Sequence, residues 1–143
     1  MNKWYGVGCN VWGQVISLHF FENALQIVQG IKPSFAKLIH LKHLSIFNGE
    51  LEFEWFDNPN MNSIGLFPSE DVLSGLTDLE ELNLHNVNMA GSLNYGLFKL
   101  RKLRFLNLAY NKLNGGISEF DWEKLDKLEM IELQKCGFSL SIP

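Results

Sequence analysis

The feature that most constrains the fold of this chain is an apolar pattern, LxxLxL, that recurs along most of its length. The segments LEELNLHNVNMAGSL at 79–93 and LRKLRFLNLAYNKLNGGI at 100–117 both contain it, and each continues to an apolar residue and a glycine. The aligned units begin at Val15, Leu41, Leu79, Leu103 and Leu128, which lie 26, 38, 24 and 25 residues apart. Such a recurrence predicts stacked copies of one supersecondary unit.

Each unit carries apolar residues at offsets three and five from its start, which predicts a short strand with alternate side chains pointing inward. These pairs are Leu18/Phe20, Leu44/Ile46, Leu82/Leu84, Leu106/Leu108 and Ile131/Leu133. Leucines at three-residue spacing, such as Leu97, Leu100 and Leu103, predict a return segment before the next strand. One unit cannot cover its own apolar face, so stacking should give a continuous core and a parallel sheet.

The turn position after each strand is occupied by Asn23, Gly49, Val87, Asn111 and Cys136. An asparagine side chain at this position can hydrogen-bond to backbone groups of neighbouring turns, and cysteine is a known substitute. We call this series of hydrogen-bonding turn residues the asparagine ladder. It is incomplete, because Gly49 and Val87 interrupt it. We therefore interpret Cys136 as a buried structural thiol rather than a reactive one.

The full unit can be written LxxLxLxxNxLxGxIP followed by xxLxxLxxL, and it is matched by LRFLNLAYNKLNGGI, by GLFP at 65–68 and by the terminal CGFSLSIP. It resembles the plant-type leucine-rich repeats of receptor-like kinases, receptor-like proteins and polygalacturonase-inhibiting proteins. The resemblance implies an α/β fold, a right-handed solenoid with short parallel β-strands on its concave face. About five repeats are expected in residues 15–143, the last of them incomplete.

The opening stretch WYGVGC resembles the end of this family's amino-terminal cap, W-x-G-V-x-C, and implies a partial cap at residues 1–14. Trp4 and Val7 should then pack over the layer formed by Val15 and Leu18, with a tight turn at a glycine. The family has a second cysteine shortly before the tryptophan. Its absence implies either that the start was trimmed, so that Cys9 is half of a disulfide whose partner was lost, or that this member dispensed with the disulfide. At the other end the sequence stops at Ile142 and Pro143, halfway through the fifth unit and without a closing cap, which predicts a fragment of a longer repeat array.

Composition excludes several classes of function. A net charge of −4, a pI near 5.5 and no run of lysine or arginine longer than two argue against a nucleic-acid partner. No apolar stretch approaches the roughly 18 residues needed to span a bilayer, and the start of the chain lacks the order of a secretory signal. The two cysteines have no spacing typical of a zinc site.

The sequence also lacks a catalytic signature. The four histidines, His19, His40, His43 and His85, form no HExxH motif, and no GxSxG or phosphate-binding glycine loop is present. Glu81 and Glu132 share only a predicted face. We therefore predict no catalytic residue, no metal site and no cofactor.

Residues that flank the inward leucines should face the concave surface, in three columns. The columns are Ser17, His43, Glu81, Phe105, Met130; His19, Ser45, Asn83, Asn107, Glu132; and Phe21, Phe47, His85, Ala109, Gln134. Large aromatics among polar neighbours often mark binding sites. The predicted ligand-binding residues are Phe21, His43, Phe47, Glu81, His85, Phe105 and Tyr110. The alternative is that Phe21 and Phe47 pack against a cap or a neighbouring segment.

The long second interval contains an insertion at about 50–64, ELEFEWFDNPNMNSI, which is acidic and aromatic. Loops inside regular repeats often build specificity, so Phe53, Trp55 and Phe56 are further candidates for contact with a basic or glycan-like partner. The alternative is that these aromatics pack on their own repeat.

These observations predict a non-catalytic module that recognises a protein or peptide, and the resemblance implies that it is part of a receptor-like ectodomain. Two alternatives remain open: a soluble inhibitor of a cell-wall-degrading enzyme, and a structural spacer or recognition arm of a larger enzyme such as a receptor kinase. The resemblance implies an extracellular or cell-surface location and a membrane anchor in the full-length protein. The sequence itself leaves a cytoplasmic location open.

Overall fold

The computed structural model describes residues 6–21, 33–47, 67–87 and 89–139. The insertion at 50–64, with its candidates Phe53, Trp55 and Phe56, lies outside the described residues. Trp4 and the turn residue Asn23 also lie outside them.

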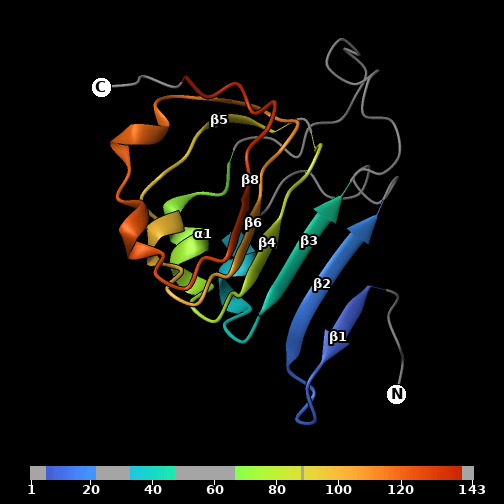
Figure 1. The fold of residues 1–143 in the computed structure, drawn as a ribbon. Helices are drawn as coiled ribbons and strands as arrows, with labels where there is room; N and C mark the ends of the chain where they lie inside the picture. Colours follow the sequence, from blue (N-terminus) through green and yellow to red (C-terminus); the bar gives the residue numbers. More distant parts are fainter. Residues whose placement is uncertain (1–5, 22–32, 48–66, 88, 140–143) are drawn as a thin grey trace.

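One mixed sheet forms the front layer of the molecule. Its strands, in spatial order, are β1 (Val7–Cys9), β2 (Val15–Phe21), β3 (His43–Phe47), β4 (Glu81–Asn83), β6 (Phe105–Asn107) and β8 (Met130–Glu132). Figure 1 shows these strands side by side, from blue β1 to red β8. β1 is antiparallel to β2, and every later pair is parallel. The predicted parallel sheet is therefore confirmed.

The parallel strands align the predicted units residue by residue. Leu18 lies opposite Leu44, Leu44 opposite Leu82, Leu82 opposite Leu106, and Leu106 opposite Ile131. The first four side chains are buried, whereas Ile131 on the last described strand is 41% exposed. This register puts the offset-three residues into one core row. A slip of one residue would turn every side chain of a strand to the other face, so burial of the leucines specifies the register.

The return segments pack behind the sheet as short helical turns. They are η2 (Pro33–Lys37), α1 (Glu70–Gly75), η3 (Leu97–Lys99), η4 (Ile117–Glu119) and η5 (Trp122–Lys124). Figure 1 shows α1 on one side of the sheet.

The three-residue leucine spacing has a direct backbone cause. In one unit the N–H of Leu100 donates to the carbonyl of Leu97, and the N–H of Leu103 donates to the carbonyl of Leu100, at 3.1 and 3.0 Å. Such i to i−3 bonds bring every third side chain to the same side of the turn. All three leucines are fully buried, so the spacing read from the sequence places them in the core.

Aromatic side chains link the later return segments. The ring of Phe98 stacks on Phe120 with centroids 5.1 Å apart, and meets Trp122 edge-on at the same distance. The indole N–H of Trp122 donates to the carbonyl of Ile117 at 2.8 Å. Phe98 is buried, and Phe120 and Trp122 pack against the core, so this cluster extends the core into the later return segments.

A second, two-stranded parallel sheet joins β5 (Ala90–Ser92) to β7 (Lys112–Asn114). A bridge between Gly116 and Ser139 continues the same side-by-side pairing into the following unit. The units are thus hydrogen-bonded to each other at two places, at the main sheet and after the turn.

The amino-terminal strand packs as the sequence predicts for Val7, which lies opposite Leu18 and contacts the core together with Val15. Gly6 adopts a positive φ of 80°, and a Cβ there would lie 2.2 Å from the carbonyl oxygen of His19. Only glycine fits this approach. The His19 N–H in turn donates to the Gly6 carbonyl at 2.7 Å.

Candidate functional site

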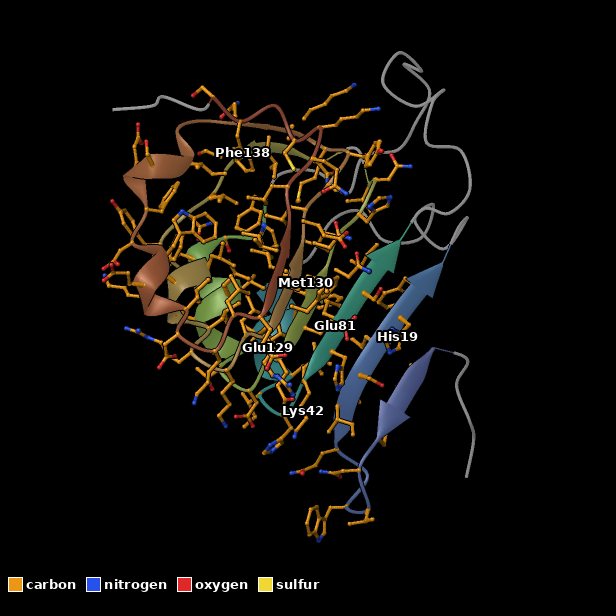
Figure 2. All side chains as sticks on the ribbon, viewed as in Figure 1. His19, Lys42, Glu81, Glu129, Met130 and Phe138 are labelled. Carbon is orange, nitrogen blue, oxygen red and sulfur yellow. The ribbon has the colours of Figure 1, made fainter. Side chains whose placement is uncertain are left out.

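The side of the sheet opposite the core rows carries the predicted columns in register. Ser17, His43, Glu81, Phe105 and Met130 pair in one row, and His19, Ser45, Asn83, Asn107 and Glu132 pair in the next. We call the side formed by these two rows the open face. Figure 2 labels His19, Glu81 and Met130 along three of its strands. Strand alternation turns these side chains away from the buried leucines between them.

The structure brings the predicted site residues together in two groups. His43, Glu81 and Phe105 are neighbours at the start of the strands. His85 and Tyr110 meet after the strands end, with ring centroids 5.2 Å apart. The second row of the open face, with Asn83 and Asn107, lies between the two groups along the chain.

Phe21 and Phe47 pair through their backbones in β2 and β3, and their side chains lie outside the described part of the chain. The ammonium group of Lys135 sits over the ring of Tyr110, 5.0 Å from its centroid. Tyr110 and Lys135 have positive φ angles of 58° and 53°, as does Asn86 at 53°. These three residues occupy the same offset in successive units, so the tight turn is a property of the repeat.

The first group lines a shallow hollow of about 280 Å³ on the open face. The lining residues are His43, Glu80, Glu81, Arg104, Phe105, Glu129 and Met130. Sequence reasoning selected His43, Glu81 and Phe105 and missed the other four. Met130 was already in a predicted column. The three charged residues each stand one position before a strand. The charge alternates from unit to unit at that position, which could have indicated them: Lys42, Glu80, Arg104, Glu129.

Two ion pairs at the rim of the hollow connect neighbouring strands. Arg104 holds Glu129 with two bonds, Nε to Oε1 at 2.9 Å and Nη2 to Oε2 at 3.0 Å. Lys42 Nζ lies 3.1 Å from Glu80 Oε1. Figure 2 places Lys42 and Glu129 toward the end of the sheet at which the strands begin. Each rim cation is therefore matched by a rim carboxylate.

Inside this rim, His43 Nδ1 lies 3.2 Å from Glu81 Oε2. Both side chains remain accessible, at 39% for His43 and 34% for Glu81. Phe105 is half-buried beside them, and Met130 is 53% exposed. The hollow thus combines a carboxylate with an aromatic ring and a thioether.

Asparagines of the second row tie side chains to the backbone at the strand ends. Asn107 Nδ2 donates to the carboxylate of Glu132, while its Oδ1 accepts the N–H of Ala109 at 3.0 Å. Asn83 Oδ1 accepts the N–H of His85 at 3.2 Å. These amides are neutral, so the charge of Glu132 stays on the open face.

A further charged set lies in the turns that precede β3, β4 and β6. Lys102 Nζ donates to Asp78 Oδ1 at 2.6 Å, and His40 Nδ1 lies 3.9 Å from Asp78 Oδ2. The hydrogen bond from Lys102 lowers the pKa of Asp78, and the same bond raises the pKa of Lys102. These pairs connect successive units just before their strands begin.

The two cysteines differ in their surroundings, since Cys9 is exposed and Cys136 is buried. Burial raises the pKa of Cys136 to about 12, so the thiol stays protonated at neutral pH. Cys9 is exposed and is not bonded to Cys136. Among the described residues, no group of three histidine, cysteine or acidic side chains could hold a metal ion. Within the same residues, no helix is both long and apolar enough to cross a membrane.

No protein-family model matches the chain. It is 41% identical over 64 residues to Receptor-like protein 7 of Arabidopsis thaliana, a match that covers 43% of the chain and 7% of that protein. The chain thus corresponds to a small part of the length of this relative.

Two solved plant structures resemble almost the whole chain. The ectodomain of the receptor kinase SOBIR1 from Arabidopsis thaliana has a TM-score of 0.70 at 24% identity, and the match covers 96% of this chain and 70% of that one. The ectodomain of the Arabidopsis receptor kinase HAESA, solved with an extended IDA peptide hormone, has a TM-score of 0.64 at 25% identity. That match covers 95% of this chain and 20% of the HAESA chain.

The chain therefore has the leucine-rich-repeat fold of plant receptor ectodomains, and it is distantly homologous to Receptor-like protein 7. The family resemblance read from the sequence is confirmed.

Proposed function

We propose that the chain is a non-catalytic recognition module whose open face binds a protein or peptide ligand, within the extracellular region of a receptor-like protein. The observation that carries this proposal is the hollow of about 280 Å³ on the open face, which presents apolar and charged side chains together. Accessible aromatic and apolar groups surrounded by polar ones are typical of binding surfaces.

The likeness to HAESA supports a peptide as the ligand, because that ectodomain was solved with a peptide hormone bound. The proposed contact residues are His43, Glu81 and Phe105 in the hollow and His85 and Tyr110 beyond the strand ends. The proposal extends to Phe21, Phe47 and the insertion at 50–64 through Phe53, Trp55 and Phe56, on the sequence pattern alone. The same acidic, aromatic loop makes a glycan a second type of partner.

The proposed architecture is a right-handed solenoid of about five repeats in residues 15–143, with the open face on its concave side and residues 1–14 as a partial cap. Parallel strands β2, β3, β4, β6 and β8, one for each unit of the sequence, support this. The antiparallel pairing of β1 with β2 supports a cap that covers the first unit. A preformed face of this kind needs no cofactor.

Peptide selection with the full chain tests the proposed function. A phage library of random dodecapeptides is selected on the immobilised chain, and enriched peptides are assayed against Phe105→Glu. The control variant is Tyr95→Glu, an equally aromatic-to-acidic change at a residue that is 63% exposed on the back layer. Circular dichroism verifies that both variants are folded.

We expect Phe105→Glu to abolish binding of the enriched peptides and Tyr95→Glu to preserve it. Equal binding to the wild type and to a folded Phe105→Glu variant would overturn the proposal, because the ligand would then bind elsewhere.

A further inference from the structure

The charges on the open face are one-sided. The two rows that define it include the carboxylates of Glu81 and Glu132, and none of their described residues is a lysine or an arginine. Arg104, which lines the hollow, is paired with Glu129, and Lys42 at the rim is paired with Glu80. Of the three glutamates that line the hollow, Glu81 is therefore the one whose partner is a histidine rather than a lysine or an arginine.

The Glu81 carboxylate remains able to receive a second partner. His43 contacts one of its oxygens, Oε2, so a ligand cation can approach the other one. The side chain is 34% exposed and lies within the hollow. A pair formed there is partly shielded from water, which strengthens it relative to a fully exposed pair.

The two residues after Glu81 in the same row are apolar. Phe105 lies opposite Glu81 on β6, and Met130 lies opposite Phe105 on β8. At about 4.8 Å between strands, the three side chains cover about 10 Å. Lysine and arginine side chains carry their charge on an apolar stem that packs along apolar surface. An aromatic ring also attracts the cation through its face.

We propose that Glu81, Phe105 and Met130 form a subsite for one lysine or arginine side chain of the bound peptide. Glu81 is the ionic partner of the basic group, and Phe105 and Met130 contact its stem. This inference rests on the proposed function and specifies the chemistry of the ligand. Charge complementarity with the acidic open face selects a cationic peptide over an acidic or neutral one.

The same dodecapeptide selection, run on the full chain and on Glu81→Gln, tests the subsite. The matched control is Glu123→Gln, an exposed glutamate of η5 on the back layer. An enriched peptide is then synthesised twice, once unchanged and once with its basic residue as citrulline or acetyl-lysine. Isothermal titration gives the four dissociation constants for the two peptides on wild type and Glu81→Gln.

We expect lysine or arginine at one enriched position on the wild type and on Glu123→Gln, and no such enrichment on Glu81→Gln. The loss of the charge-assisted pair should weaken binding about five- to tenfold, by either change alone. Both changes together should weaken it no further than one, because they remove the same interaction.

Two results would overturn the subsite, and they separate it from the proposed function. Peptides that require Phe105 but show no basic preference, or bind Glu81→Gln as tightly as wild type, contradict the subsite and leave peptide recognition standing. Peptides that do not require Phe105 contradict both.

Discussion

The side chains of Asn111 and Cys136 donate hydrogen bonds to the same backbone carbonyl, that of Leu108, at 2.8 and 2.9 Å. The two residues hold the same turn position in consecutive units. Asn111 also donates to Leu84 at 2.7 Å, and Leu84 is the equivalent of Leu108 in the preceding unit. Cys136 thus repeats, with a thiol, the bond by which Asn111 holds the unit before it.

Replacing Asn111 with alanine should destabilise the chain strongly. Its amide nitrogen donates to Leu84, Leu108 and Ala109, and its oxygen accepts the N–H groups of Val87 and Met89. All of these backbone groups would be left buried without that partner, at a total cost of about 3 kcal/mol or more. The free energy of unfolding, measured with urea, reports the loss.

The control for Asn111→Ala is Asn114→Ala, at an exposed position of β7. It should change the free energy of unfolding by less than about 0.5 kcal/mol. If the two variants lost similar amounts of unfolding free energy, the asparagine ladder would not be what stabilises the fold.

Cys136 should be unreactive until the chain unfolds. Its side chain is 2% exposed, and burial raises its pKa to about 12, whereas Cys9 is exposed. A thiol-reactive disulfide reagent at pH 8 should therefore label one thiol in the native chain and two in denaturant. Rapid labelling of both in the native chain would contradict the buried assignment.

The raised pKa of Cys136 also predicts a pH dependence of stability. Because the folded pKa lies above that of an unfolded cysteine, near 8.5, the stabilising contribution is complete below about pH 8.5 and falls as pH rises toward 12. The slope reaches about 1.4 kcal/mol per pH unit at most. The difference in unfolding free energy between wild type and Cys136→Ala should shrink over this range, and a constant difference would contradict it.

The sequence predicted the rows of the sheet because the inward leucines leave little freedom of register. Leu44 and Leu82 must both be buried, so their neighbours His43 and Glu81 must share the opposite face. The turn positions of Asn111 and Cys136 were predicted because both residues stand at the same offset from the start of their units, Leu103 and Leu128. The repeat pattern does not specify how the return segments between the strands pack. There Phe98 stacks on Phe120, a contact that leucine spacing does not predict.

The candidate site was predicted less completely. Its row of His43, Glu81 and Phe105 follows from the register, but the rim pair Arg104 and Glu129 does not. Whether two charged side chains on adjacent strands meet depends on their rotamers, which the repeat leaves free. For the same reason, the sequence could not place His85 against Tyr110.

The contact between α1 and η2 predicts that Gly75 cannot be enlarged. An added Cβ would lie 2.4 Å from the carbonyl oxygen of Ala36 and 2.9 Å from its Cα. Because backbone atoms cannot move aside cheaply, Gly75→Ala should cost about 1–3 kcal/mol. Ser74→Ala, one residue earlier in the same helix, is the control and should cost less than about 0.5 kcal/mol. A neutral Gly75→Ala variant would contradict the close packing of these two turns.

The pair of Asp78 and Lys102 should make part of the stability depend on acid pH. The hydrogen bond from Lys102 lowers the folded pKa of Asp78 below its usual value, outweighing the opposite effect of partial burial. A lowered folded pKa means that the stabilisation is complete above the unfolded pKa, near 4, and is lost as pH falls through the folded value. The difference in unfolding free energy between wild type and Asp78→Asn should therefore be constant at neutral pH and decline below about pH 4. It should also shrink at high salt, since the Lys102 side chain is 61% exposed. Asp126→Asn, in an exposed turn, is the control, and an acid-dependent loss of equal size there would show that the Lys102 contact is not the cause.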